Sequence, residues 1–175
     1  MIGRLFFLTF ALTWIFSPMA YARDSSSSTL PIVGYVEKVK IYLPSSHIVI
    51  KAKIDTGAKT SSLDVNHLVF FSQQGEDWVR FSVTDDDGEP ILLSLPVERS
   101  TRIRRAGAKR DERPVVKLGL CVGGYFKEGE VNLTEREGMN YPMLIGRRFL
   151  SQSFLVDSAH KFVQKKPRCK KREEK

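Results

Sequence analysis

The feature that most constrains this chain is a series of short segments in which every second residue is apolar. Residues 47–54, 78–84 and 115–122 follow this pattern, and a period of two places the apolar side chains on one face of a β-strand. Turn-forming groups separate the segments, Asp85–Gly88 and Gly123–Gly124 among them. Many short strands with almost no helical period favour an all-β fold that closes into a barrel.

More strands are expected where apolar runs are rich in β-branched and aromatic residues. One or two helical turns are expected at residues 147–151, near the C-terminus. We therefore predict a closed β-barrel with one short helix, whose strand edges must be paired or covered, for example by a second copy of the chain. The additional strands are residues 32–43, 91–97, 125–133, 143–145 and 154–156.

The first 22 residues are organised as a signal peptide. Arg4 supplies a positive charge, and residues 20–22 have the small-x-small pattern of a cleavage site. The apolar run between them, residues 5–16, is shorter than the ~20 residues of a spanning helix. We therefore predict cleavage after Ala22, export across the inner membrane and a periplasmic location. The alternative is an uncleaved membrane anchor.

The rest of the chain has the length of one domain. We place a polar linker at residues 23–30, the domain at residues 31–163 and a basic disordered tail at residues 164–175. The whole chain has a net charge of +8, and this tail holds seven Lys or Arg and two Glu. Such a run is usually solvated, and its alternative role is contact with an anionic membrane surface. Nucleic acid is not an expected partner of an exported protein.

The two cysteines leave their pairing open. Cys121 belongs to an apolar strand segment, whereas Cys169 belongs to the charged tail. An oxidising compartment permits a bridge between them. A buried thiol with a separate tail thiol, or a pair between two molecules, fits the sequence equally well.

The segment with the clearest chemical character is Asp55-Thr56-Gly57-Ala58. It follows an amphipathic strand directly. Gly57 allows a sharp turn and the close approach of another backbone, and Thr56 can form a hydrogen bond to a neighbouring copy of the loop. The tripeptide alone also describes an ordinary turn with a solvated Asp.

A second motif follows about ninety residues later. Apolar residues 143–145 precede Gly146 and Arg147, and the predicted helix and the last strand come next. These motifs, in this order, resemble the retropepsins, the family of the retroviral proteases, over roughly residues 49–162. A bacterial branch of that family, whose members are called ATP-dependent zinc proteases, is similar in particular to residues 51–63, 113–116 and 141–147.

The resemblance implies an acid-protease barrel and an aspartic endopeptidase. In this family each chain brings one Asp, and a two-fold homodimer places two carboxylates close enough to share a proton. One acts as a base on water and the other as an acid toward the amide, and the pair titrates as a unit. The implied partners are a second copy and a peptide or protein substrate. The residues carried over are Asp55 for catalysis, Thr56, Gly57 and Ala58 for the loop, and Gly146 and Arg147 for its support.

No metal or other cofactor is expected. The sequence has no Gly-rich phosphate loop and no His-Glu-x-x-His motif. Asp64 and His67 make at most a fragment of a metal site. Asp157 is interpreted as a strand-end residue, because Ala159 stands where an Asp-Ser-Gly motif needs Gly.

Two hairpins between the motifs are candidates for a substrate cover. One surrounds residues 85–88, and the other spans residues 102–110, whose positive charge favours an acidic substrate such as a Glu-rich peptide. Lys59, beside the Asp55 loop, departs from the viral enzymes, which commonly have an acid there. That departure also fits the alternative function, a catalytically silent binding or regulatory protein of the periplasm on the same fold.

Overall fold

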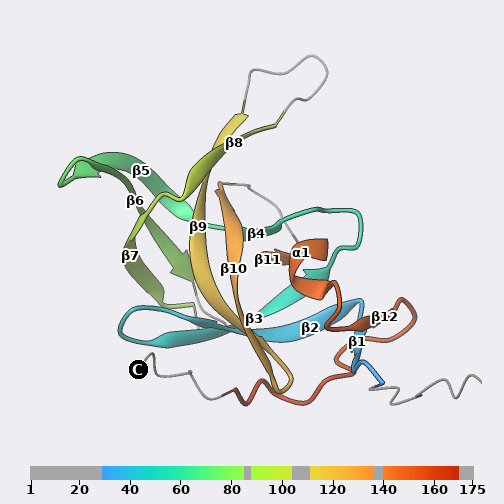
Figure 1. Ribbon diagram of the computed structural model, residues 1–175. Helices are drawn as coiled ribbons and strands as arrows, with labels where there is room; N and C mark the ends of the chain where they lie inside the picture. Colours follow the sequence, from blue (N-terminus) through green and yellow to red (C-terminus); the bar gives the residue numbers. More distant parts are fainter. Residues whose placement is uncertain (1–28, 85–87, 104–110, 136–139, 170–175) are drawn as a thin grey trace, which may run out of the picture.

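The computed structural model describes residues 29–84, 88–103, 111–135 and 140–169. The predicted signal peptide therefore lies outside the described residues, as does the predicted linker up to residue 28. The described part consists of β-strands and one short helix, which confirms the all-β prediction (Figure 1). No helix in that part combines the length and the apolar composition of a membrane span.

Six strands close into a barrel. β9 pairs with both β10 and β2, so the ring has no free edge. β11 runs parallel to β3. A segment near the C-terminus therefore pairs with a segment from the first third of the chain. In order round the barrel the strands are β2 (Val36–Tyr42), β3 (His47–Ile54), β11 (Met143–Ile145), β4 (Ser61–Asp64), β10 (Tyr125–Thr134) and β9 (Asp111–Val122).

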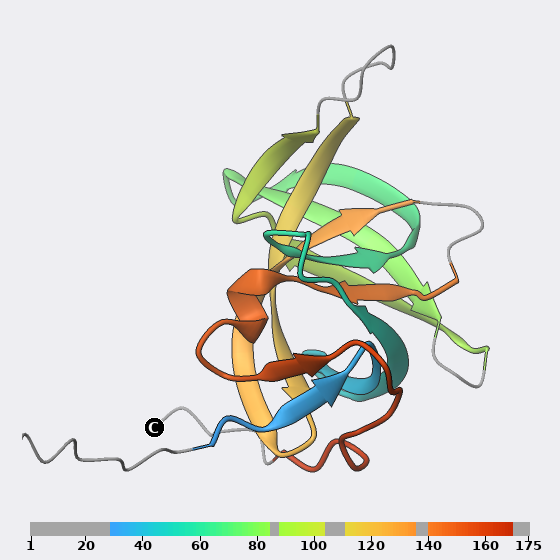
Figure 2. The same ribbon diagram turned by 90° about the vertical axis from the view of Figure 1, so that its right-hand side faces the viewer.

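The remaining strands flank the barrel. β8 (Arg99–Ile103) pairs with the first half of β9, and the two project beyond the barrel (Figure 2). β1 (Ile32–Gly34) and β12 (Leu155–Asp157) form a separate parallel pair. A three-stranded sheet consists of β5 (Asn66–Gln73), β6 (Glu76–Thr84) and β7 (Pro90–Pro96).

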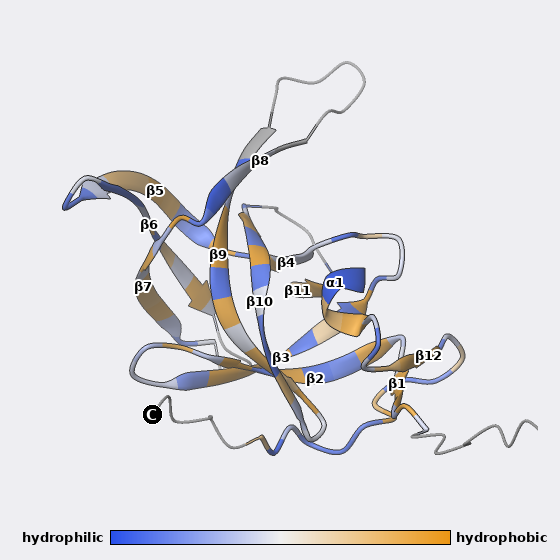
Figure 3. Cartoon of the chain, viewed as in Figure 1, coloured by the Kyte–Doolittle hydropathy of each residue, from blue (hydrophilic) through white to orange (hydrophobic). Residues whose placement is uncertain are grey.

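The alternation seen in the sequence fills the core. On β3, Ile50 and Ala52 are buried while Lys51 and Lys53 face solvent, and polar and apolar residues alternate visibly along β9 and β10 (Figure 3). β6 and β7 add their inner residues to the same core, which therefore continues from the barrel to the three-stranded sheet. The predicted Gly123-Gly124 turn joins β9 to β10, and Gly123 takes a φ of +58°.

The sequence pattern does not predict β4, β5 or β8. β4 lacks β-branched residues, and β5 shows no alternation of burial along its length. The expected strand at residues 32–43 is two strands, β1 and β2. They separate at Tyr35, whose N–H donates to the carbonyl of His160 at 2.9 Å.

The C-terminal segment is ordered further than predicted. The prediction of a disordered tail is wrong for residues 164–169, which lie against the barrel. We call residues 158–169 the strap. A disulfide joins Cys169 to Cys121 on β9, and the N–H of Arg168 donates to the carbonyl of Gly123 at 2.8 Å. The pairing that the sequence left open is therefore an internal bridge.

A buried carboxylate holds the middle of the strap. Glu37 on β2 is 1% exposed. Its Oε1 accepts hydrogen bonds from the N–H groups of Gly34 at 2.7 Å and Gln164 at 3.1 Å. One acid thus fixes β1 and the strap to the end of the barrel.

The disulfide should contribute strongly to stability. It closes a separation of 48 residues, for which the chain-entropy model gives about 4 kcal/mol. We expect a reductant to lower the urea midpoint of the wild-type protein and to leave a Cys121→Ser/Cys169→Ser variant unchanged. Equal midpoints for oxidised and reduced wild type would contradict a stabilising role for the bridge.

Candidate active site

Asp55 lies at the end of β3 in a fixed orientation. Its N–H donates to the carbonyl of Ile145 on β11 at 2.9 Å, which extends the parallel ladder by one step. Its Oδ1 accepts hydrogen bonds from the N–H groups of Gly57 at 3.0 Å and Ala58 at 3.2 Å. Asp55 is half-buried and Thr56 is exposed, so an anchored carboxylate stands at the protein surface.

The short helix α1 (Arg147–Leu150) holds the loop from the other side. The first N–H groups of a helix have no partner within the helix. Here the N–H of Arg147 donates to the carbonyl of Ala58 at 2.9 Å, and that of Arg148 donates to the carbonyl of Lys59 at 3.0 Å. The start of the helix and the Asp55 loop therefore satisfy each other's backbone groups.

The Arg147 side chain adds a second connection. Its Nη1 donates to the carbonyl oxygens of Thr56 and Gly57, both at 2.8 Å. Hydrogen bonds from a charged donor are stronger than neutral ones. The structure thus brings together all the site residues that the sequence analysis singled out: Asp55, Thr56, Gly57, Ala58, Gly146 and Arg147.

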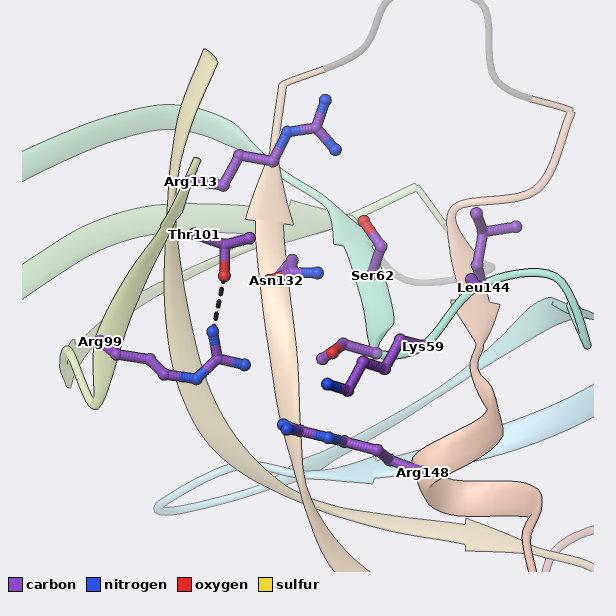
Figure 4. A pocket seen from close by; sticks show the side chains of 10 residues that line it. Lys59, Ser62, Arg99, Thr101, Arg113, Asn132, Leu144 and Arg148 are labelled. Carbon is purple, nitrogen blue, oxygen red and sulfur yellow. Dashed lines mark hydrogen bonds between the residues drawn. The ribbon is translucent and has the colours of Figure 1, made fainter. Parts of the chain in front are cut away.

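A cavity of about 410 Å³ opens beside the loop. Side chains from β8, the loop and α1 reach into it, with Arg99, Lys59 and Arg148 converging from three directions (Figure 4). The described lining residues include four cations and no acid. They are Ala58, Lys59, Thr60, Ser62, Arg99, Thr101, Arg113, Asn132, Leu144 and Arg148.

One carboxylate borders the cationic cavity. Glu130 forms an ion pair with Arg99 at 2.6 Å and a second one with Arg148. The hydrogen bond from Arg99 holds the pKa of the Glu130 carboxyl below its ordinary value, and the charge of Arg148 adds to this effect. The same bond raises the pKa of the Arg99 guanidinium. Glu130 therefore stays ionised and orients two of the four cations.

Two polar atoms in the cavity wall have no partner among the described residues. They are Ser62 Oγ and Asn132 Oδ1, which are both buried. Ser62 and Asn132 face each other in the β4–β10 register. Buried polar atoms normally have a hydrogen-bond partner, so these two unpaired atoms are an unusual feature of the cavity wall.

Of the two hairpins that were predicted as candidate substrate covers, one lines the cavity and the other does not. The hairpin of β8 and β9 brings Arg99, Thr101 and Arg113 into the cavity wall, although its tip at residues 104–110 lies outside the described residues. The β6–β7 hairpin, around residues 85–88, contributes no described lining residue. The second candidate is therefore the one beside the Asp55 loop.

The other singled-out acids and histidines lie outside this cavity lining. Asp157 accepts hydrogen bonds from the N–H of Ala159 at 2.8 Å and from His160 at 2.7 Å, and these two bonds hold its pKa below the ordinary value. Among residues 29–84, 88–103, 111–135 and 140–169, no three or more His, Cys, Asp or Glu side chains cluster as metal ligands. This includes the surroundings of Asp64 and His67.

Sequence reasoning missed most of the cavity. Arg99 and Thr101 belong to a strand that the pattern does not predict, and Ser62 belongs to another. Arg113 did carry a sequence signal, because it belongs to residues 113–116, which take part in the family resemblance. The structure adds that its side chain is buried, with 3% exposed.

Gly146 allows the close contact between the two motifs. A Cβ at this position would lie 2.7 Å from the carbonyl carbon of Thr60 and 2.8 Å from its oxygen. We expect Gly146→Ala to lower the free energy of unfolding by about 1–3 kcal/mol, because backbone atoms cannot move aside cheaply. Urea denaturation measures the effect.

The matched control is Gly129→Ala on β10, where a Cβ would meet nothing within 4 Å. We expect this change to shift stability by less than about 1 kcal/mol. Equal effects of the two substitutions would show that the contact with Thr60 is not tight.

Comparisons with known proteins agree with this geometry. The family model described as "Retropepsin-like aspartic endopeptidase RimB" matches residues 32–167. A Legionella pneumophila protein of unknown function, known from its crystal structure, is 31% identical with a TM-score of 0.62. The match covers 75% of this chain and 96% of that chain.

Two curated relatives are each named "Probable alpha-L-glutamate ligase". The one from Shewanella halifaxensis is 34% identical over 117 residues, which are 65% of this chain and 25% of that protein. The one from Desulfotalea psychrophila is 30% identical over 113 residues, or 63% and 24%. This chain thus matches about a quarter of the length of these relatives. Because the family model covers most of the sequence, the chain belongs to the RimB-like family of retropepsin-like aspartic endopeptidases.

Proposed function

We propose that the chain is an aspartic endopeptidase that works as a homodimer, with Asp55 of each copy in one catalytic dyad. The observation that carries this proposal is the anchored carboxylate at the protein surface. Both hydrogen bonds to it go to Oδ1, so Oδ2 has no partner among the described residues. Each chain has one Asp-Thr-Gly segment, and a dyad therefore requires two copies.

In this mechanism the two carboxylates share one proton, because two charges so close together are not both stable. The ionised member takes a proton from water, which attacks the carbonyl carbon of the substrate. The protonated member donates its proton to the substrate. When the peptide bond breaks, this proton leaves on the amine, and the dyad keeps the proton that was taken from water. The contacts of Arg147 keep the loop in one geometry, which is what an oriented attack needs.

The pair of β1 and β12 supports a dimer. Each strand pairs only with the other among the described strands, so each keeps an open edge. The pair also exposes apolar side chains, with Ile32 at 47%, Leu155 at 55% and Val156 at 37%. Strands of a second copy would satisfy these edges and cover this surface.

Asp55→Asn should lower the rate of peptide hydrolysis by at least about a hundredfold, since it removes the acid–base group. The wild-type rate should rise as the pH falls below neutral, because the dyad needs its shared proton. Cleavage of a denatured protein, followed by mass spectrometry, measures both effects, and sedimentation gives the oligomeric state.

Asp77→Asn is the matched control, because it removes an exposed carboxylate on β6, outside the cavity lining and outside β1 and β12, and should keep the activity. A wild-type protein that binds peptide but never cleaves it, or that remains a strict monomer, would support the alternative of a silent binding protein.

We further propose that the substrate is acidic and rich in Glu. Arg99, Arg113 and Arg148 line the cavity beside the Asp55 loop, and the planar guanidinium suits carboxylates. The Ser62 and Asn132 side chains add polar groups to the same cavity wall. The names of the glutamate ligases that match this chain point to the same class of substrate.

Lys59→Gln/Arg148→Gln should raise the KM for a Glu-rich peptide roughly tenfold, since each lost charged hydrogen bond weakens binding. The KM for a neutral peptide should change little. The control Arg80→Gln/Lys117→Gln removes the same charge from residues outside the cavity lining. Equal KM values for the first variant and the wild type would argue against acidic recognition.

The proposed site of action is the periplasm. The signal-peptide pattern of residues 1–22 supports export. The disulfide between Cys121 and Cys169 supports an oxidising compartment.

A further inference from the structure

A group of lysines on the outside of the barrel has no role in the proposed hydrolysis. β2 and β3 carry Lys38, Lys40, Lys51 and Lys53 at alternate positions, between core residues that point inward. We call these four residues the lysine face. Within the described residues none of them forms an ion pair.

The lysine face is continuous with the strap. Lys38 stands directly opposite Lys51 in the β2–β3 ladder, an arrangement of like charges that destabilises a sheet. On the other side of β2, Lys40 is paired with Cys121, whose disulfide brings Cys169 next to it. Figure 1 shows the strap running below β2 toward this point, and its contacts are with β2: the N–H of Phe162 donates to the carbonyl of Val36, and the hydroxyl of Tyr42 donates to the carbonyl of Cys169.

Acids do not balance this charge. The only acid between residues 36 and 54 is Glu37, which is buried and hydrogen-bonded to backbone N–H groups. Residues 158–169 contain no acid and four cations: Lys161, Lys165, Lys166 and Arg168. An excess of positive charge therefore extends over both elements.

Apolar side chains project from the same strap. Phe162 is 44% exposed and Val163 is 41% exposed, and they stand between Lys161 and Lys165 in the sequence. Phe162 has a φ of +54°, which bulky residues rarely adopt. The hydrogen bond from its N–H to the carbonyl of Val36, at 2.8 Å, fixes this conformation. Exposed apolar groups among cations are typical of segments that lie in a membrane interface.

We propose that the lysine face and the strap bind the surface of a bilayer that contains anionic phospholipid. The choice of cation separates this surface from the cavity. Lysine is a compact charge on a flexible stem and suits a fluid layer of anions, whereas the planar guanidinium suits fixed carboxylates. The cations of the cavity are three arginines and one lysine, whereas all the Lys and Arg residues of β2 and β3 are lysines.

The test is the binding of the protein, recovered from a host that exports it, to vesicles pelleted by centrifugation. Vesicles of phosphatidylethanolamine with phosphatidylglycerol should bind it, and vesicles of phosphatidylcholine should not. Any apolar N-terminal residues contribute equally to both. Binding to the anionic vesicles should disappear in about 0.5 M NaCl, because salt screens exposed charges.

The variant Lys38→Gln/Lys51→Gln should bind the anionic vesicles about 30-fold more weakly, since each cation near the surface contributes roughly fivefold. Its melting temperature should be equal to or above that of the wild type, because the substitutions remove a repulsive pair. Lys53 is left intact because it pairs with Leu144, which lines the cavity. The matched control, Arg80→Gln/Lys117→Gln, should keep the wild-type affinity.

Three results would overturn the proposal: equal binding to neutral and anionic vesicles, equal losses in the two double variants, or unchanged vesicle binding with impaired cleavage of an acidic peptide in the lysine variant. The last result would assign the surface to the substrate. Asp55→Asn should bind vesicles as the wild type does, so membrane binding and hydrolysis can fail independently.

Discussion

The candidate site depends on the parallel pairing of β11 with β3. β11 is three residues long, yet it joins β3 on one side and β4 on the other. The hydrogen bond from Asp55 to Ile145 continues this ladder beyond β3. Gly146 then allows close contact with Thr60, and α1 starts directly against the loop. The position of the carboxylate is therefore set by a contact between segments that are about ninety residues apart.

This dependence explains which parts the sequence could predict. The alternating strands and the motifs around Asp55 and Gly146 are local patterns, because each residue's role follows from its near neighbours. β4 is different, since Ser61–Asp64 has weak strand propensity and forms a strand because β10 and β11 pair with it on both sides. The cavity combines Ser62, Arg113 and Asn132, whose proximity follows only from the register of the closed barrel.

The charge of the chain shows the same limit. Composition alone assigns the positive excess to a solvated tail, yet residues 164–169 are held by a disulfide and by backbone hydrogen bonds. In the fold the cations divide into an arginine-rich cavity beside Asp55 and lysines on β2 and β3. Net charge therefore indicates that anionic partners are favoured. Only the positions of the cations in the fold distinguish a cavity that suits carboxylates from a broad positive surface.

The strap connects the proposed compartment with the proposed dimer. Its disulfide requires oxidising conditions, and Gln164 within it binds both the buried carboxylate of Glu37 and the carbonyl of Ile32 on β1. Glu37 in turn accepts the N–H of Gly34, the last residue of β1. The strand whose free edge would meet a second copy is thus held by a segment that is covalently closed only after oxidation. In the proposed sequence of events, export would permit strap closure, strap closure fixes β1, and β1 would then offer its free edge to the second copy whose Asp55 completes the dyad.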